Sequence, residues 1–276
     1  MEKIGMVGVG AMGSALLERL KLAGAAVVAY DIAPEALEAA RAAGAEIAAS
    51  AKAVAQAATI VDIVVRKDQE ILDCAMGKDG VFEGAKPGAL VILHSTILPQ
   101  TTRRVAEAAG PRGIDVIDAC MIGVPSVVRE GKLSFVVGGP KEVYDRARPH
   151  LLKMSKQTLH MGPLGAGNVS KLVKNLVGGS ETLIIHEAIQ IAEAAGIAYP
   201  EALEMMRQVY SGTLLNRWQK TFDPSGSSPM PGSGHNVFDK DIPLAGELAR
   251  QYGLSLPITE QLVAAGKRIV KAKSAR

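Results

Sequence analysis

The sequence predicts an α/β protein in two parts: a parallel-sheet domain over residues 1–163 and an all-helical domain over residues 164–276. Up to about Pro140, short apolar runs rich in β-branched residues alternate with Ala-rich helical patterns. Strand-like alternation ends after Gly167, and glycines and a proline punctuate residues 160–167. Alternating strands and helices of this length predict a parallel sheet with helices on both faces.

Each predicted element follows from its local pattern. The strands are short, apolar and bounded by turn residues: Ile4–Val9, Ala26–Tyr30, Ile60–Val65, Ala89–His94, Gly113–Ala119 and Leu133–Val137. The helices between the first four strands are Gly13–Ala23, Pro34–Ala43, Ala51–Ala57 and Gln69–Met76. Pro34 begins its helix, where a missing N–H costs nothing. In the second part we expect helices at Val169–Ala195, Pro200–Tyr210, Ile242–Tyr252 and Pro257–Ala272.

Composition narrows the possible classes of function. A chain of 276 residues can bury a core without disulfides or metals. The formal net charge is +3 and no basic cluster is interleaved with aromatics, so we expect no nucleic-acid partner. Charged residues interrupt the apolar stretch 172–195, which argues against a membrane span. Two cysteines fit a reducing compartment, and we expect a cytoplasmic protein.

A glycine-rich turn follows the first predicted strand. Its sequence, Gly8-Val-Gly10-Ala-Met-Gly13, has the G-x-G-x-x-G spacing of a Rossmann-type dinucleotide site. Gly8 would allow the tight turn, Gly10 the close approach of the pyrophosphate, and Gly13 the packing of helix on strand. The backbone of Ala11 and Met12, at the helix N-terminus, would face the phosphates. The alternative is an Ala/Gly-rich turn of another α/β protein.

Asp31 ends the second predicted strand, 21 residues after Gly10. This is close to the spacing of the acid that binds the adenosine ribose. A carboxylate accepts hydrogen bonds from both ribose hydroxyls and repels a 2′-phosphate. No Arg follows closely, because residues 32–34 are Ile, Ala and Pro. The sequence therefore predicts NAD rather than NADP.

Lys171 and Asn175 lie four residues apart at the start of the long predicted helix, and so share one face. The partial positive charge of a helix N-terminus disfavours an ammonium. That environment, with burial, would lower the pKa of Lys171 toward the range useful for proton transfer. The alternative is a solvated basic helix face.

These motifs resemble those of the β-hydroxyacid dehydrogenase family, which includes 3-hydroxyisobutyrate and tartronate semialdehyde dehydrogenases or reductases. The resemblance covers the whole chain in order. The matching segments are the glycine turn with Ala23-Gly24, His94-Ser95-Thr96-Ile97-Leu98-Pro99, Asp118 to Gly139, the pattern Gly165-x-Gly167-x-x-x-Lys171-x-x-x-Asn175, and Lys240-Asp241.

The resemblance implies a mechanism. Hydride would pass between nicotinamide and C3 of a small hydroxy-acid or aldehyde-acid substrate, with Lys171 exchanging the hydroxyl proton. Asn175 would orient the substrate, the turn beginning at Asp118 would hold its carboxylate, and Thr96 and Lys240 would contact the cofactor. The family also implies a 6-phosphogluconate dehydrogenase-like C-terminal domain and a homodimer or homotetramer.

The substrate segment departs from the family pattern. Ile122 replaces a carboxylate-binding Ser, and Val124 replaces a Gly, while Gly123 is kept. The change removes a hydroxyl donor and adds apolar bulk, so we expect a bulkier or less polar substrate than tartronate semialdehyde. The alternative is that backbone N–H groups around Gly123 suffice and the substrate is an ordinary one.

At several other positions the sequence allows more than one role. Val65-Arg66 stands where the family has Leu-Pro, and Arg66 would either contact the cofactor or be solvated. The sequence offers no account of Asp62. His235, Tyr210, Trp218 and the loop Asp223–Gly234 are candidates for the pocket or a lid. The competing functions are an imine reductase, which Lys171 and Asp31 argue against, and a non-catalytic NAD-binding module.

Overall fold

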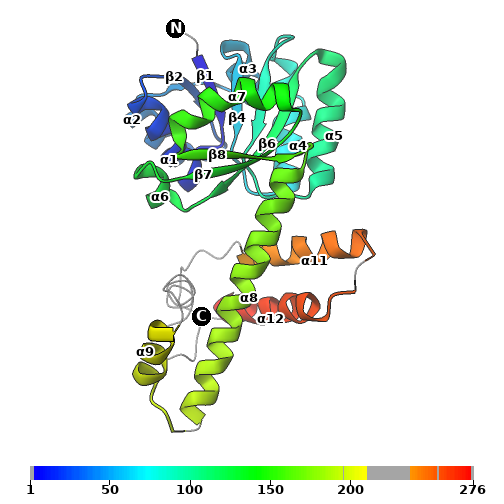
Figure 1. The fold of residues 1–276 in the computed structure, drawn as a ribbon. Helices are drawn as coiled ribbons and strands as arrows, with labels where there is room; N and C mark the ends of the chain where they lie inside the picture. The colour runs from blue at the N-terminus through cyan, green and yellow to red at the C-terminus, as the bar shows by residue number, and fades with distance from the viewer. Residues whose placement is uncertain (1–2, 195, 210–236, 254, 275–276) are drawn as a thin grey trace. The chain divides into compact units, whose positions relative to one another are not determined.

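The computed structural model describes residues 3–194, 196–209, 237–253 and 255–274, and the chain divides into two compact units, Met1–Lys171 and Leu172–Arg276 (Figure 1). The expectations for Tyr210, Trp218, His235 and the loop 223–234 lie outside the described residues.

The first unit is built on an eight-stranded sheet with the order β3-β2-β1-β4-β5-β6-β7-β8. The strands are β1 Lys3–Val7, β2 Ala26–Tyr30, β3 Glu46–Ile47, β4 Ile60–Ile63, β5 Leu90–Leu93, β6 Asp115–Ile122, β7 Ser134–Gly138 and β8 Gln157–Gly162. The first six are parallel. Strand order reverses between β1 and β4, and the crevice outside the carboxyl ends at such a point is where doubly wound sheets bind ligands.

The prediction of a parallel sheet is wrong at one edge. β7 pairs with β6 antiparallel, and β8 is parallel to β7. The link from β6 to β7 holds the five-residue helix α6 (Pro125–Arg129), too little chain for the crossover that parallel strands require. β8 was not predicted, because its burial alternates between exposed and half-buried positions without an apolar run.

Helices cover both faces of this sheet (Figure 1). One apolar core lies under α1 (Ala11–Leu22), α2 (Pro34–Ala42), α6 and α7 (Lys141–Met154). The other lies under α3 (Ala51–Ala57), α4 (Asp68–Met76) and α5 (Pro99–Ala109). Short 3₁₀ turns occupy Val81–Glu83 and Gly110–Arg112. The first four helices are confirmed, whereas α5, α6 and α7 were not predicted.

The second unit is helical in its described part. Its elements are α8 (Ala166–Ala194), which begins in the first unit, α9 (Tyr199–Val209), a π-type turn at Val237–Asp241, α11 (Ile242–Gln251) and α12 (Pro257–Ser274). Its core includes Leu183, Ile189, Phe238, Ile242 and Leu262. None of the helices within the described ranges is long and apolar enough to cross a membrane.

Candidate active site

The first βα turn has the geometry that its glycines predict. Gly8 follows β1 with a φ of +91°, in the region that favours glycine. A Cβ on Gly8 would lie 2.4 Å from the carbonyl oxygen of Val64, and a Cβ on Gly13 would lie 2.1 Å from the carbonyl oxygen of Gly8. Both positions therefore require glycine for the packing of the chain itself.

Gly10 differs from these two glycines. A Cβ there would meet no protein atom within 4 Å, so internal packing does not demand glycine. Gly10 is exposed and caps α1, whose first turn contains Ala11 and Met12. Unpaired N–H groups and the helix dipole at this point suit a pyrophosphate, which a Cβ on Gly10 would obstruct. The residues present therefore fit a dinucleotide.

The carboxylate of Asp31 is fixed beside the same turn. Its Oδ2 accepts a hydrogen bond from the Val9 N–H at 2.7 Å, and its Oδ1 accepts one from the Ala33 N–H at 3.0 Å. Each carboxylate oxygen has a further lone pair, so ribose hydroxyls can still donate to it. Asp31 thus stabilises the turn and retains acceptor capacity for a ribose.

Two further strand ends lie along the same edge of the sheet. Beyond β4, Val65 is half-buried and Arg66 is exposed. The Arg66 N–H donates to the Glu70 carboxylate at 2.8 Å, which ties this segment to the start of α4. Beyond β5, the Ser95 hydroxyl donates to the Val65 carbonyl, and half-buried Thr96 follows. The two predicted cofactor segments are thus joined by a hydrogen bond.

Lys171 lies in the second turn of α8, within the first unit. Its Nζ donates to the carbonyl oxygen of Met121 at 2.6 Å. Met121 is the last residue but one of β6 and precedes Ile122. The hydrogen bond therefore holds the lysine nitrogen at the carboxyl end of β6, next to the predicted substrate segment.

The substrate segment is partly strand. Ile122 is half-buried and ends β6, Gly123 follows, and Val124 is 52% exposed and precedes α6. The expected turn beginning at Asp118 is wrong in its first half, because Asp118 lies inside β6 and is fully buried.

Asp118 instead holds the beginning of α8. Its two oxygens accept hydrogen bonds from the N–H groups of Gly165 and Asn168, each at 2.7 Å. This capping explains why α8 starts three residues before the predicted Val169. Burial raises the pKa of the Asp118 carboxyl above its ordinary value, more than the hydrogen bonds from Gly165 and Asn168 lower it.

Asn168 is a residue that sequence reasoning missed. Its side chain is fully buried and donates to the Ser95 carbonyl oxygen at 3.0 Å and to the Cys120 sulfur at 3.2 Å. Its Oδ1 accepts from the Thr102 hydroxyl at 2.6 Å. Asn168 therefore connects the cofactor segment after β5, the end of β6 and the helix that contains Lys171. A buried amide with three partners gives no local pattern in sequence.

In the second unit, Asn175 and Lys240 approach the same carboxylate. Asn175 Nδ2 donates to Asp241 Oδ2 at 2.6 Å, and Asp241 is 4% exposed. Lys240 Nζ lies 3.2 Å from Asp241 Oδ1, an ion-pair distance without hydrogen-bond alignment. The Asn175 Oδ1 accepts from Lys174 Nζ at 3.2 Å. Asp241 thereby orients the Asn175 amide.

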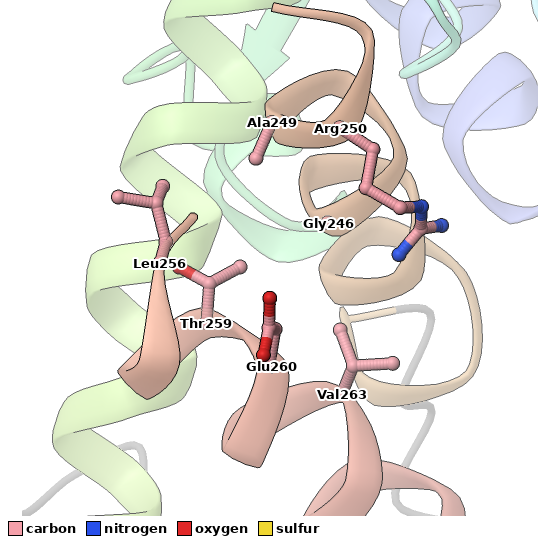
Figure 2. A pocket seen from close by; sticks show the side chains of 7 residues that line it. All are labelled: Gly246, Ala249, Arg250, Leu256, Thr259, Glu260 and Val263. Carbon is pink, nitrogen blue, oxygen red and sulfur yellow. The ribbon is translucent and has the colours of Figure 1, made fainter. Parts of the chain in front are cut away.

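A small pocket between α11 and α12 is separate from these residues. It is lined by Gly246, Ala249, Arg250, Leu256, Thr259, Glu260 and Val263 (Figure 2). The Arg250 guanidinium forms an ion pair with Glu247 at 2.7 Å. None of the predicted site residues lines this pocket, and we assign it no role.

Comparison with known families settles the class. Residues 3–162 match the family model described as the NAD binding domain of 6-phosphogluconate dehydrogenase, and residues 165–275 match the NAD-binding model of NADP-dependent 3-hydroxyisobutyrate dehydrogenase. The chain is 33% identical over 264 residues to 3-hydroxyisobutyrate dehydrogenase of Pseudomonas aeruginosa, covering 94% of this chain and 89% of that protein.

The chain belongs to the β-hydroxyacid dehydrogenase family. It is also 30% identical to an NAD-dependent L-serine dehydrogenase of Pseudomonas aeruginosa over the same shares of the two chains. Among solved structures, 3-hydroxyisobutyrate dehydrogenase of Mycobacterium tuberculosis with L-serine has a TM-score of 0.85 at 27% identity, covering 97% of this chain and 93% of that one. The protein is therefore an NAD(P)-dependent oxidoreductase acting on CH–OH groups.

An imine reductase from Myxococcus stipitatus, with a TM-score of 0.66 at 20% identity, shows a related fold alone. The structural match covers 99% of this chain and 94% of the reductase. This likeness adds no argument for imine reduction.

Proposed function

We propose that this β-hydroxyacid dehydrogenase uses NAD to oxidise a 3-hydroxy acid with an apolar substituent at C2. The observation behind the proposal is the 2.6 Å hydrogen bond from Lys171 Nζ to the Met121 carbonyl oxygen. It brings a proton-transfer group to the carboxyl end of β6, beside Ile122. The same sheet edge presents the glycine turn and Asp31.

The preference for NAD rests on Asp31. Its carboxylate is held by two backbone N–H groups beside the glycine turn, where it can accept from ribose hydroxyls. A 2′-phosphate at that position would meet a fixed negative charge. Ala11, Met12, Val65, Arg66 and Thr96 are proposed to contribute further cofactor contacts at the same edge.

Lys171 is the proposed proton-transfer residue. A bound nicotinamide would supply the hydride acceptor, or in reduction the hydride donor, for C3 of the substrate. In oxidation, the neutral amine of Lys171 takes the hydroxyl proton, and in reduction its ammonium returns that proton. A positioned acid–base residue contributes about 10²–10⁴ in rate. Asn175, whose amide Asp241 orients, is proposed to orient the substrate, and Lys240 is proposed to contact the cofactor.

The substrate class follows from the end of β6. The named substrates of three relatives, 3-hydroxyisobutyrate, L-serine and 2-(hydroxymethyl)glutarate, are all 3-hydroxypropanoates that differ at C2. Ile122 offers no hydroxyl donor, and Val124 adds apolar surface. An apolar wall leaves the polar groups of L-serine or tartronate semialdehyde unpaired, so it favours an alkyl group at C2.

A substrate panel with NAD tests this proposal. We expect the highest kcat/KM with 3-hydroxyisobutyrate or a larger 2-alkyl-3-hydroxypropanoate, and a shift toward L-serine and glycerate, the alcohol form of tartronate semialdehyde, in Ile122→Ser. The matched control is Val143→Ser, a half-buried change that lies in α7, outside the substrate segment. Highest activity of the unmodified protein on glycerate would refute the substrate class.

The Lys171→Met variant tests the chemistry separately. It should bind NAD with unchanged affinity and lose turnover by about 10²–10⁴. Equal turnover in the variant would remove Lys171 from the mechanism, and lost NAD binding would assign it to the cofactor site instead. Assembly as a homodimer or homotetramer is a further proposal, which light scattering of the purified protein decides.

A further inference from the structure

Three buried polar side chains lie outside the proposed chemistry, on the sheet face that α1 and α7 cover. Asp62 belongs to β4, His94 follows β5, and His150 belongs to α7. They are 0%, 1% and 3% exposed. Burying ionisable groups is costly unless they are paired, so their arrangement requires a physical explanation.

Short, direct contacts join these side chains. Asp62 Oδ1 lies 2.8 Å from His94 Nε2, and Asp62 Oδ2 lies 2.8 Å from His150 Nε2. The other nitrogen of His94, Nδ1, lies 2.8 Å from the carbonyl oxygen of Ala119 on β6. A metal ion would separate the nitrogens from the oxygens, and the described residues hold no acid, histidine and cysteine cluster arranged as a metal site.

The contacts of His94 determine its protons. A carbonyl oxygen only accepts, so Nδ1 of His94 must carry hydrogen. An ionised carboxylate also only accepts, so Nε2 must carry hydrogen as well. Burial acts to raise the pKa of Asp62, but the charge and hydrogen bonds of His150 and His94 outweigh burial and leave that pKa below its ordinary value. His94 is therefore an imidazolium beside an ionised Asp62.

His150 is the second partner of Asp62. Its Nε2 contacts the carboxylate, whereas its buried Nδ1 makes no hydrogen bond within the described residues. Like His94, it lowers the pKa of Asp62 through its charge and its hydrogen bond.

The other groups packed around the cluster are mostly apolar. The core on this face contains Met6 from β1, Leu16 from α1 and Phe135 from β7, whose ring centroid is 5.1 Å from that of His94. The titratable Tyr144 of α7 bonds through its hydroxyl to Thr158. Asp118 of β6 contacts the start of α8, on the opposite face.

We propose that Asp62 and His94 are positioning residues whose buried hydrogen bonds hold the carboxyl ends of β5 and β6 in register for cofactor binding. The His94 ring links β4 to β6 across β5. Ser95 and Thr96 follow His94 directly, and β6 continues to Met121, the partner of Lys171. The inference rests on the proposed function for the roles of Thr96 and Lys171 alone.

A dependence of NAD affinity on this cluster follows from the geometry. Without the Asp62 carboxylate, Nε2 of His94 and Nε2 of His150 each lose a hydrogen bond. The Ser95-Thr96 segment then loses its alignment, and NAD affinity falls. Loss of one such bond corresponds to a change of about tenfold in the dissociation constant.

The Asp62→Asn variant isolates this effect. An amide of the same shape can donate from Nδ2 to His94 Nε2 and accept at Oδ1 from His150 Nε2, so every hydrogen bond of the cluster is kept without charge. We expect the NAD dissociation constant to rise about tenfold in Asp62→Leu, which removes these hydrogen bonds, and to stay near that of the unmodified protein in Asp62→Asn. His160→Asn, at a histidine of β8 bonded to the Gly139 carbonyl, is the matched control and should follow the unmodified protein. An equal rise in Asp62→Asn, or no rise in Asp62→Leu, would overturn the proposal.

Nitrogen NMR of histidine-labelled protein provides the direct readout. Near neutral pH, both ring nitrogens of His94 should carry hydrogen, with the signal assigned by its loss in His94→Gln. In Asp62→Asn, Nε2 should lose its hydrogen. A His94 ring with a single hydrogen in the unmodified protein would overturn the ion pair. Neither measurement uses turnover, so failure of the hydroxy-acid activity would be recognised separately.

Discussion

Asp62 and Asp118 are the same residue type, equally buried, on opposite faces of one sheet, yet their partners differ. Asp62 contacts two histidine rings, and its pKa is lowered despite the burial that acts to raise it. Asp118 contacts the neutral N–H groups of Gly165 and Asn168, and burial leaves its pKa raised. Hydrogen bonds satisfy both carboxylates, but a charged partner is needed to outweigh desolvation. Asp62 therefore works as part of an ion pair, and Asp118 as a helix cap.

The largest expected effect is that of Asp118→Ala. It leaves two buried N–H groups at the start of α8 unpaired, so the free energy of unfolding should fall by roughly 2–4 kcal/mol. Turnover should fall as well, because Lys171 lies in the next turn of that helix. Urea unfolding and steady-state kinetics measure the two effects.

The matched control is Asp115→Ala, on the same strand. Asp115 forms a half-exposed ion pair with Arg146, and such pairs contribute about 0–1 kcal/mol. The capping role would be contradicted if Asp118→Ala lowered the free energy of unfolding by no more than Asp115→Ala does.

A smaller effect is expected from Thr102→Val. The Thr102 hydroxyl is buried and donates to Asn168 Oδ1, so its removal leaves that acceptor unpaired and should cost about 1–2 kcal/mol of unfolding free energy. Thr102→Ser, which keeps the hydroxyl, should recover most of the loss. Equal destabilisation in both variants would assign the effect to the missing methyl group and not to the hydrogen bond.

The smallest expected effect concerns the free energy of unfolding, which should depend on pH in opposite directions at Asp62 and Asp118 when each is compared with its Asn variant. The pKa of Asp62 is lower in the folded protein than in the unfolded chain, where it is about 3.9. Ionised Asp62 therefore stabilises the fold above that unfolded value, and this stabilisation is lost as the pH falls through the folded pKa. The advantage of the unmodified protein over Asp62→Asn should therefore shrink on acidification. For Asp118, whose folded pKa is raised, the advantage should instead grow as pH falls. Denaturant unfolding from neutral to acidic pH measures both differences. If the stability difference between the unmodified protein and its variant changed with pH in the same direction for both aspartates, the contrast between them would be wrong.

The glycine turn could be predicted because its requirements are local. Gly8 and Gly13 are fixed by backbone approaches within a few residues or an adjacent strand, and Asp31 by its place after β2. The roles of Asp62 and Asp118 could not be predicted. The partners of Asp62 are 32 and 88 residues away, and those of Asp118 are 47 and 50 residues away. Spacing along the chain contains no signal for such contacts.

The sheet edge was predicted incompletely for a related reason. β6 was expected to end at Ala119 but continues to Ile122, because its last residues pair with β7. That antiparallel pairing depends on how far the short link can reach, which periodicity does not report. The site residues of the second unit, Asn175 and Lys240, were expected from family resemblance, and their shared partner Asp241 emerged from the structure.

The double engagement of Asp31 restricts how this enzyme could be converted to the phosphorylated cofactor. Because its oxygens bond to Val9 and Ala33, a substitution that removes the carboxylate, such as Asp31→Ala, also leaves two backbone donors without acceptors. Redesign toward NADP therefore has to supply a neutral acceptor at position 31 together with a new cation for the phosphate. Nucleotide preference and the integrity of the loop that binds the nucleotide are encoded by one side chain, so a single substitution cannot separate them.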